Sequence, residues 1–319
     1  MRRLLLLLLP ALLLPAFPLR AQMAKSAAPA PDKTLCFAHR DTCDLLLDFY
    51  AAAPGRGPCA DSLRKPVVIH NFGGAFAMGS RNQAADRVWY RQLADEGYHV
   101  AAIDYRLGMK GVKASGLSSL PILRNAIQMA VDDLFSATDY LIENAETLAV
   151  DIDRIVVSGS SAGAMTALQA EWEICSAMEP AKALPGWFNY AGIMAFSGAV
   201  FSLEGTIRFP QKPCPVLLFH GTADRIVPYG QITLPGKQFA GGDALAKKLK
   251  AVGANFQIYR FLDAGHEIAS TMKHNLPEEL RFLDQNVIRG IYRPLDALVK
   301  DGSIPVPDWA KATARDLYK

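Results

Sequence analysis

The sequence has no marked excess of either charge and no long block of one sign. Its 319 residues include 34 Lys and Arg against 31 Asp and Glu, which gives a formal net charge of +3. A chain that binds nucleic acid or an anionic membrane surface is typically strongly basic, so the balance argues against both kinds of partner. We therefore expect a small-molecule or polymer substrate.

Signatures of phosphate, dinucleotide and metal sites are also missing. The chain contains neither a Walker loop nor the glycine fingerprint of dinucleotide-binding folds. His266-Glu267 begins like a zinc-protease motif, but Ser270 stands where that motif needs its second histidine. We expect no cofactor and no metal ion. The tryptophans are scattered and are expected to serve packing rather than base stacking: Trp89, Trp172, Trp187 and Trp309.

The leucine-rich run at 4–17 falls short of the roughly 20 residues that a membrane-spanning helix needs, and two prolines interrupt it. Arg2 and Arg3 precede the run and small residues follow it, a pattern typical of a secretory signal peptide. We expect a signal peptide at 1–21, a flexible leader at 22–34, and a secreted or periplasmic protein. An uncleaved membrane anchor is the alternative. After cleavage we expect no stable membrane insertion.

Cysteine is sparse, and its number is odd. The five thiols belong to Cys36, Cys43, Cys59, Cys175 and Cys214. Export would permit disulfides, but an odd count leaves at least one thiol unpaired or paired between chains. The first three lie close together in sequence, so we expect one bridge among them. The sequence does not choose the pair.

Short apolar strands alternate with helical patterns along the rest of the chain. Strands are expected at 44–50, 66–70, 99–105, 153–158, 191–196, 215–220 and 256–261. Helices are expected at 83–96, 123–148, 162–175 and 242–252, and in broken form at 277–299. This alternation predicts an α/β fold with a mostly parallel sheet covered on both faces. No long linker or repeat interrupts it, so one domain is expected at 35–319.

Gly159, Ser161 and Gly163 form a Gly-x-Ser-x-Gly pattern between a predicted strand and a predicted helix. A nucleophilic serine needs a tight strand-to-helix turn that exposes its hydroxyl at the edge of the sheet, and a side chain at either glycine position would clash there. The new helix also begins next to the site where negative charge would develop. The pattern predicts Ser161 as a nucleophile.

A glycine-rich loop, Gly73-Gly74-Ala75, directly follows the predicted strand that ends at His70. Backbone N–H groups reach a tetrahedral oxyanion only where side chains are absent or very small. Phe72 stands directly before the glycines. The loop is therefore a candidate oxyanion hole, and His70 is a candidate structural residue.

Two polar residues follow the last two predicted strands of the sheet. Asp224 lies in the sequence His220-Gly-Thr-Ala-Asp224, just after the strand at 215–220, where a carboxylate can orient a catalytic imidazole. Glu204 is the alternative acid. Among the six histidines, only His266 lies in a loop directly after the final strand and after the acid. The sequence therefore predicts His266 as the base.

These motifs, in the order Ser161, Asp224, His266, resemble those of the α/β-hydrolase fold superfamily. The resemblance covers most of the chain. It is closest to carboxylesterases and to polysaccharide-side-chain (acetyl or feruloyl) esterases. It implies a sheet of about eight strands with helices on both faces and little or no lid insertion. Matched to the family's glycine-rich loop, which has a histidine where this chain has Phe72, Gly74 and Ala75 become the expected oxyanion donors, with Ala162 as the third.

The resemblance implies hydrolysis of carboxylic esters through an acyl-enzyme, with acyl or feruloyl groups on polysaccharides as one substrate class. The short stretch between the strands at 191–196 and 215–220 leaves little room for a lid, which favours an open site. The loops at 108–119 and 229–242 could wall the site instead. Two alternatives stay open: a serine peptidase similar to prolyl oligopeptidase, and a non-catalytic binding module on the same fold.

Overall fold

The computed structural model describes residues 28–113, 116–314 and 316. Its strands are β1 (Lys33–Arg40), β2 (Cys43–Tyr50), β3 (Lys65–Asn71), β4 (His99–Ile103), β5 (Val150–Ser160), β6 (Gly192–Phe196), β7 (Ala199–Ser202), β8 (Val216–Gly221), β9 (Gln231–Leu234), β10 (Lys237–Gly241), β11 (Phe256–Phe261) and β12 (Leu295–Val299). Its α-helices are α1 (Ala84–Asp95), α2 (Leu120–Glu143), α3 (Ala162–Cys175), α4 (Gly242–Ala251) and α5 (Leu276–Phe282).

Within the described residues, nine strands form one sheet in the order β1-β2-β4-β3-β5-β6-β8-β11-β12. The pairs β1–β2 and β2–β4 are antiparallel. The remaining neighbours in this sheet, in the order β4-β3-β5-β6-β8-β11-β12, all pair in parallel. Parallel neighbours need crossover connections. Helices supply them, except between β6 and β8, where the connection contains strand β7. This mixed, mostly parallel sheet confirms the predicted α/β-hydrolase fold.

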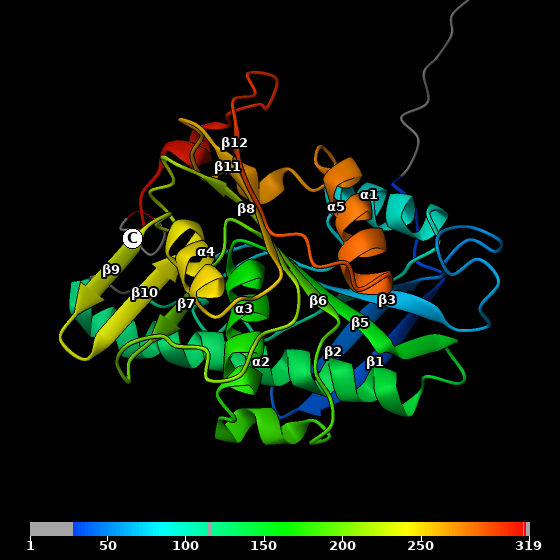
Figure 1. Ribbon diagram of the computed structural model, residues 1–319. Coiled ribbons are helices and arrows are strands. Elements are labelled where there is room, and N and C mark those ends of the chain that lie inside the picture. The colour runs from blue at the N-terminus through cyan, green and yellow to red at the C-terminus, as the bar shows by residue number, and fades with distance from the viewer. Residues whose placement is uncertain (1–27, 114–115, 315, 317–319) are drawn as a thin grey trace, which may run out of the picture.

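Successive residues of a central strand point to opposite faces of the sheet, so both faces need cover. In β3, Val67 and Ile69 belong to the buried cluster that also contains α2, α3 and α4 side chains, while Val68 belongs to the cluster that contains α1 and α5 side chains. The helices accordingly lie on both sides of the sheet (Figure 1). Among the described helices, none combines the length and apolar character needed to cross a membrane.

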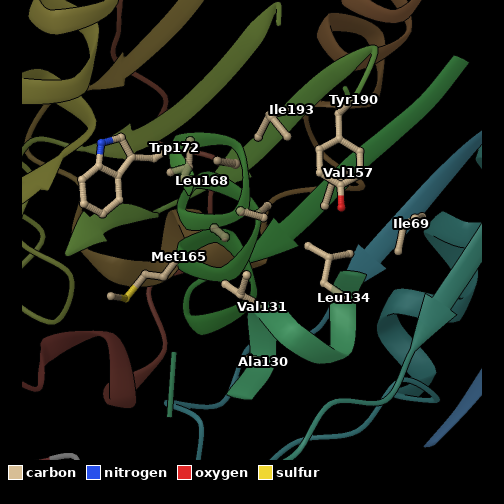
Figure 2. Close-up of a cluster of buried hydrophobic side chains, with 14 of the residues drawn as sticks. Ile69, Ala130, Val131, Leu134, Val157, Met165, Leu168, Trp172, Tyr190 and Ile193 are labelled. Atoms are coloured by element: carbon tan, nitrogen blue, oxygen red, sulfur yellow. The ribbon is translucent and has the colours of Figure 1, made fainter. Parts of the chain in front are cut away.

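The larger cluster sits between the middle of the sheet and helices α2 and α3. Figure 2 shows Ile69, Val157 and Ile193 of the sheet gathered with Leu134 of α2 and Leu168 of α3. Each fully buried aliphatic side chain of this kind stabilises the fold by about 1.5–3 kcal/mol relative to its exposed state. The packing fixes α3 against β5, and therefore fixes the turn that joins them.

Two segments differ from the sequence-based expectations. The region 229–242, expected as a loop, forms the hairpin β9–β10, which pairs with β7 in a separate sheet of three strands within the described residues. The region 277–299, expected as a broken helix, ends in strand β12. The partly buried and exposed residues of β12 alternate along its length, and Asp296 binds Arg260 of the neighbouring strand β11. These cross-strand contacts make it the ninth strand.

The predicted disulfide is wrong for this structure: all five cysteines lie in the described part of the chain and carry free thiols. Cys36 and Cys43 lie on the β1–β2 hairpin, and Cys59 is buried in the turn before β3.

The signal peptide predicted at 1–21 lies outside the described residues. Strand β1 begins at Lys33, inside the predicted leader, and the guanidinium of Arg87 binds the carbonyl oxygens of Ala28 and Pro29.

Candidate active site

The turn that carries Ser161 is sharp and strained. Strand β5 ends at Ser160 and α3 begins at Ala162, so a single residue reverses the chain direction. Ser161 has φ 51° and ψ −114°, in a region that side-chain-bearing residues rarely occupy. Its N–H donates to the carbonyl oxygen of Phe196 at 2.9 Å, which holds the turn against β6. The turn leaves the Ser161 side chain partly exposed at the carboxyl edge of the sheet.

The two glycines of the Gly-x-Ser-x-Gly pattern are required by close backbone contacts. A Cβ added at Gly163 would lie 2.0 Å from the carbonyl oxygen of Asn71, at the end of β3. A Cβ added at Gly159 would lie 2.2 Å from the carbonyl carbon of Gly163. Both distances are far inside van der Waals contact, so any larger residue would push α3 away from the sheet. The sequence-based explanation of the glycines agrees with this packing.

Three side chains predicted from distant segments meet in one hydrogen-bonded chain. The Oγ atom of Ser161 lies 2.7 Å from Nε2 of His266, and Nδ1 of His266 lies 2.7 Å from Oδ2 of Asp224. His266 follows β11 and begins a short 3₁₀ helix, whereas Asp224 lies in the turn after β8. Both are buried, with exposed fractions of 4% and 7%. The arrangement is that of a nucleophile, a base and an orienting acid.

The surroundings of Asp224 favour its ionised form. Its Oδ1 atom accepts hydrogen bonds from the N–H groups of Ile226 and Val227, at 2.9 and 3.0 Å. Burial by itself would raise the pKa of Asp224, but the hydrogen bonds from His220 and His266 outweigh burial and lower this pKa well below its usual range. The carboxylate therefore stays ionised and can stabilise an imidazolium at His266.

His220 contacts the same carboxylate oxygen of Asp224 as His266 does. Its Nε2 atom lies 3.0 Å from the carbonyl oxygen of Val227 and 3.4 Å from Oδ2 of Asp224. The N–H of Gly242, at the start of α4, donates to its Nδ1 atom at 3.3 Å. Both ring nitrogens are thus engaged away from Ser161 and His266. His220 is therefore a positioning residue for Asp224, in agreement with its predicted structural role.

The glycine-rich loop lies directly against Ser161. A Cβ added at Gly73 would lie 3.4 Å from Cβ of Ser161. Gly74 has φ 140°, and its carbonyl oxygen accepts the N–H groups of Ala77 and Met78, which closes the loop into a tight turn. Together with Ala162, the loop residues Gly74 and Ala75 line the space around Ser161. The three predicted oxyanion residues therefore surround the nucleophile, and their roles stay a prediction.

Phe72 takes the place where the family has its histidine. Its ring stacks on Tyr105 with a centroid distance of 4.3 Å, and the Tyr105 hydroxyl donates to the Phe72 carbonyl oxygen at 2.8 Å. His70, two residues earlier, is fully buried against Trp89, and burial lowers the pKa of His70 to about 3. His70 is therefore a neutral structural residue, and the Phe72–Tyr105 pair anchors the start of the loop.

Two cavities within the described residues meet at Ser161. The smaller one, of about 210 Å³, is apolar and is walled by α2, α3 and the β9–β10 hairpin through Leu123, Met165 and Phe239, among others. The larger one, of about 630 Å³, lies on the side of His266. Its walls include the Gly73-Gly74 loop, the first turn of α1 and the segment around Trp309.

Two residues of the larger cavity were not predicted from the sequence as site residues. Asp86 lies in the first turn of α1, and the half-exposed ring of Trp309 contacts His266 edge-on, with centroids 6.1 Å apart. Trp309 packs against His266, as the packing prediction allows, and it also lines the cavity, which that prediction did not include. Helix α1 follows the glycine-rich loop, so its start lies at the carboxyl edge of the sheet, and that position is a usable sequence signal for Asp86. We find no comparable signal for Trp309.

The alternative acid and a possible group of metal ligands both lie away from Ser161, His266 and Asp224. Glu204 is exposed, and its carboxylate contacts the hydroxyl of Ser202 rather than a histidine. One group in the described part of the chain has metal-ligand types close together: Cys36, His39 and Asp44, whose ligand atoms lie within 4.8 Å of one another. This group lies on the β1–β2 hairpin and lines neither cavity at Ser161.

Comparison with known proteins identifies relatives for this arrangement. Residues 121–283, which contain Ser161, Asp224 and His266, match the family model described as Phospholipase/Carboxylesterase. Residues 56–173 match the model described as BD-FAE.

Individual relatives match over shorter segments. Gut esterase 1 of Caenorhabditis elegans is 29% identical over 104 residues, and Esterase LipI of Mycobacterium tuberculosis (strain ATCC 25618 / H37Rv) is 28% identical over 105 residues. Each match covers 33% of this chain but only 18% and 28% of the respective relative.

Solved structures share the fold over most of the chain. The apo form of Thermogutta terrifontis esterase 2 has a TM-score of 0.57 at 20% identity, covering 83% of this chain and 96% of the other. A second structure, of the native thermophilic esterase Est2 from the same species, has a TM-score of 0.55 at 21% identity, covering 78% and 91%.

Proposed function

The chain belongs to the phospholipase/carboxylesterase family, and from this premise we propose that it hydrolyses carboxylic esters through an acyl-enzyme on Ser161. The observation that carries the proposal is the chain of two 2.7 Å contacts from Ser161 through His266 to Asp224. The hydroxyl, imidazole and carboxylate are in the contact order that nucleophilic catalysis requires.

The first half-reaction forms the acyl-enzyme. Nε2 of His266 takes the proton from Ser161 Oγ as this oxygen attacks the ester carbonyl carbon. The carbonyl oxygen becomes an oxyanion, which the backbone N–H groups of Gly74, Ala75 and Ala162 would stabilise. When the C–O bond of the ester breaks, the leaving alcohol oxygen takes the proton from His266.

The second half-reaction restores the enzyme. A water molecule gives a proton to His266 and attacks the acyl carbon, and the same N–H groups hold the second oxyanion. The bond to Ser161 Oγ then breaks, Ser161 recovers its proton from His266, and the carboxylic acid leaves. Asp224 stays ionised throughout and stabilises the imidazolium in both halves.

Hydrolysis of p-nitrophenyl acetate and butyrate tests this proposal. We expect Ser161→Ala to lower kcat by on the order of 10⁶, to background, because the nucleophile is lost. The matched control is Ser176→Ala, the same change just beyond the other end of α3, which should keep wild-type activity. An inactive wild-type protein, or an active Ser161→Ala variant, would refute the proposal. Hydrolysis of aminoacyl amides in preference to esters would favour the peptidase alternative.

The finer proposal is that the ester is an acyl or feruloyl group on a polysaccharide. It is supported by the partial exposure of Ser161 and by the size of the cavity on the His266 side, which is about three times the apolar one. The test is release of acetate and ferulate from acetylated and feruloylated polysaccharides, measured beside p-nitrophenyl esters of the same acids. A protein that cleaves only the p-nitrophenyl esters would contradict the polysaccharide substrate.

We also propose that the protein is exported, either to the periplasm or out of the cell. The support is the sequence of the segment 1–21, with Arg2 and Arg3 before a short leucine-rich run. Expression of the full chain followed by N-terminal sequencing of the exported protein tests this. A start near residue 22 is expected, and protein that stays in the cytoplasm with an intact first residue would contradict export.

A further inference from the structure

The mechanism assigns each cavity to one half of the ester. The leaving alcohol oxygen must take its proton from His266, and only the larger of the two cavities at Ser161 is lined by His266. The alcohol half therefore lies in the larger cavity. The acyl half is left with the smaller cavity, whose walls are almost entirely apolar.

Asp86 lies in the wall of this alcohol cavity. Its side chain is only partly exposed, and within the part of the chain that the structure describes it has neither a hydrogen bond nor an ion pair. Burial raises the pKa of Asp86 to about 6. An unpaired, half-buried carboxyl costs stability, so its hydrogen-bonding capacity is available to a ligand.

The other groups around the alcohol cavity are polar without being basic. Gln83, the N-cap residue of α1, lies three residues before Asp86, and Ser270 is the last residue of the 3₁₀ helix that begins at His266. Among the described lining residues the ionisable groups are Asp86, Asp316 and His266, with no lysine or arginine. Trp309 adds a large apolar ring that is 48% exposed.

We propose that Asp86 is a specificity-determining residue that accepts hydrogen bonds from the hydroxyl groups of a sugar-like alcohol, with Trp309 as the apolar surface beneath the sugar ring. The proposal rests on the proposed ester hydrolysis. Carboxylate, amide and hydroxyl groups around one aromatic ring match an alcohol that presents several hydroxyls and a C–H face.

A cationic alcohol fits this set of groups less well. Hydroxyl groups can donate to Asp86, and they can also pair with neutral amide and hydroxyl groups, whereas a cation gains most from negative charge. Gln83 and Ser270 also add hydrogen-bonding capacity but no negative charge. The structure therefore favours a hydroxyl-rich alcohol over an amino alcohol.

The test compares Asp86→Leu with Asp95→Leu, the same change at an exposed position on the same helix. Three acetyl esters are used as substrates: an O-acetylated xyloside, p-nitrophenyl acetate and acetylcholine. We expect Asp86→Leu to lower kcat/KM for the xyloside by about 10- to 100-fold, mainly through KM, because hydrogen bonds to an ionisable group are lost. The loss on p-nitrophenyl acetate, whose leaving group has no hydroxyl to donate to Asp86, should be much smaller than the loss on the xyloside. Asp95→Leu should match wild type on all three esters.

Other outcomes overturn the inference. A loss confined to acetylcholine would show that the cavity selects a cation, and equal losses on all three esters would show that Asp86 is structural. Binding of the xyloside to Ser161→Ala, with and without Asp86→Leu, is measured by calorimetry. If binding to Ser161→Ala depends on Asp86 but the wild-type protein hydrolyses none of the three esters, the proposed function fails while the alcohol site stands. If binding is indifferent to Asp86, the site fails.

Discussion

Asp224 determines how the imidazole of His266 is oriented, because it accepts the hydrogen bond from Nδ1 and leaves Nε2 facing Ser161. An amide at this position would favour the wrong tautomer of His266. We expect Asp224→Asn to lower kcat for p-nitrophenyl acetate by roughly 10⁴, with little change in KM. Glu204→Gln, the corresponding change at the alternative acid, should leave kcat unchanged. A large loss in Glu204→Gln with an active Asp224→Asn would reverse the assignment.

Asp86 should make the protein less stable as the pH rises. Its pKa is about 6 in the folded protein against 3.8 for the ordinary side chain, so the folded state holds a proton that the unfolded state has lost. The free energy of unfolding therefore falls as the pH rises from about 4 to about 6. Above about pH 6 the full destabilisation by the buried, ionised carboxylate is present. Below pH of about 4 both states are protonated and the cost vanishes.

Substitution of Asp86 by asparagine removes this titration. We expect the stability of Asp86→Asn relative to wild type to increase as the pH rises through this window, measured by urea unfolding at several pH values. Asp95→Asn, on the same helix, is the control and should show no such trend. A difference between Asp86→Asn and wild type that stays constant with pH would contradict the proposed burial cost.

At the residue scale, the sequence predicted the triad but not the residues that would choose the substrate. Ser161 has a local motif, and Asp224 and His266 follow strand ends, which the topology brings to one edge of the sheet. Asp86 and Trp309 carry no motif. They reach the cavity because α1 and the residues after β12 pack there, and that packing depends on the whole tertiary structure.

Among the elements, the β9–β10 hairpin has the most direct effect on function, because it walls the apolar cavity. Ile232 and Leu234 of β9 and Phe239 of β10 line this cavity together with α2 and α3. The sequence predicted that the 229–242 segment could wall the site, but it did not predict strands. The segment becomes extended because β10 pairs with β7, which lies much earlier in the sequence.

We expect Ile232→Trp to shorten the range of accepted acyl chains. The larger ring would fill part of a cavity of only about 210 Å³, while Ile232 is 46% exposed and tolerates a larger side chain. Each methylene that loses apolar contact costs about 0.8 kcal/mol, so the preference for p-nitrophenyl octanoate over acetate should fall by about 10-fold or more. Ile291→Trp, an exposed position that lines neither cavity at Ser161, should leave the preference unchanged.

Strand β12 shows where reasoning about single elements fails. Its five residues were expected within a broken helix, since Gly290 and Pro294 interrupt the helical pattern but do not indicate a strand after the break. The strand forms because β11 offers an unpaired edge, to which Leu295–Val299 adds in parallel. Local propensity does not contain that information, because the pairing partner lies more than thirty residues earlier.

At the scale of the whole molecule, the two buried clusters share one sheet. Val67 and Ile69 belong to one cluster and Val68 to the other, so the loss of either cluster would expose one face of β3. We propose that the chain from residue 35 onward is one cooperative domain. Urea unfolding followed by far-UV circular dichroism and by tryptophan fluorescence should then give coincident transitions. Two separate transitions would contradict the single domain.

The separation of the two cavities at Ser161 has a chemical consequence under the proposed mechanism. Once the first product departs, the acyl group remains in the apolar cavity while the cavity beside His266 is vacant. Water must then compete there with any dissolved alcohol, and an alcohol shaped for that cavity competes best. The same protein would thus partition its intermediate between hydrolysis and transacylation, and in a medium rich in sugar hydroxyls it would make esters as well as break them.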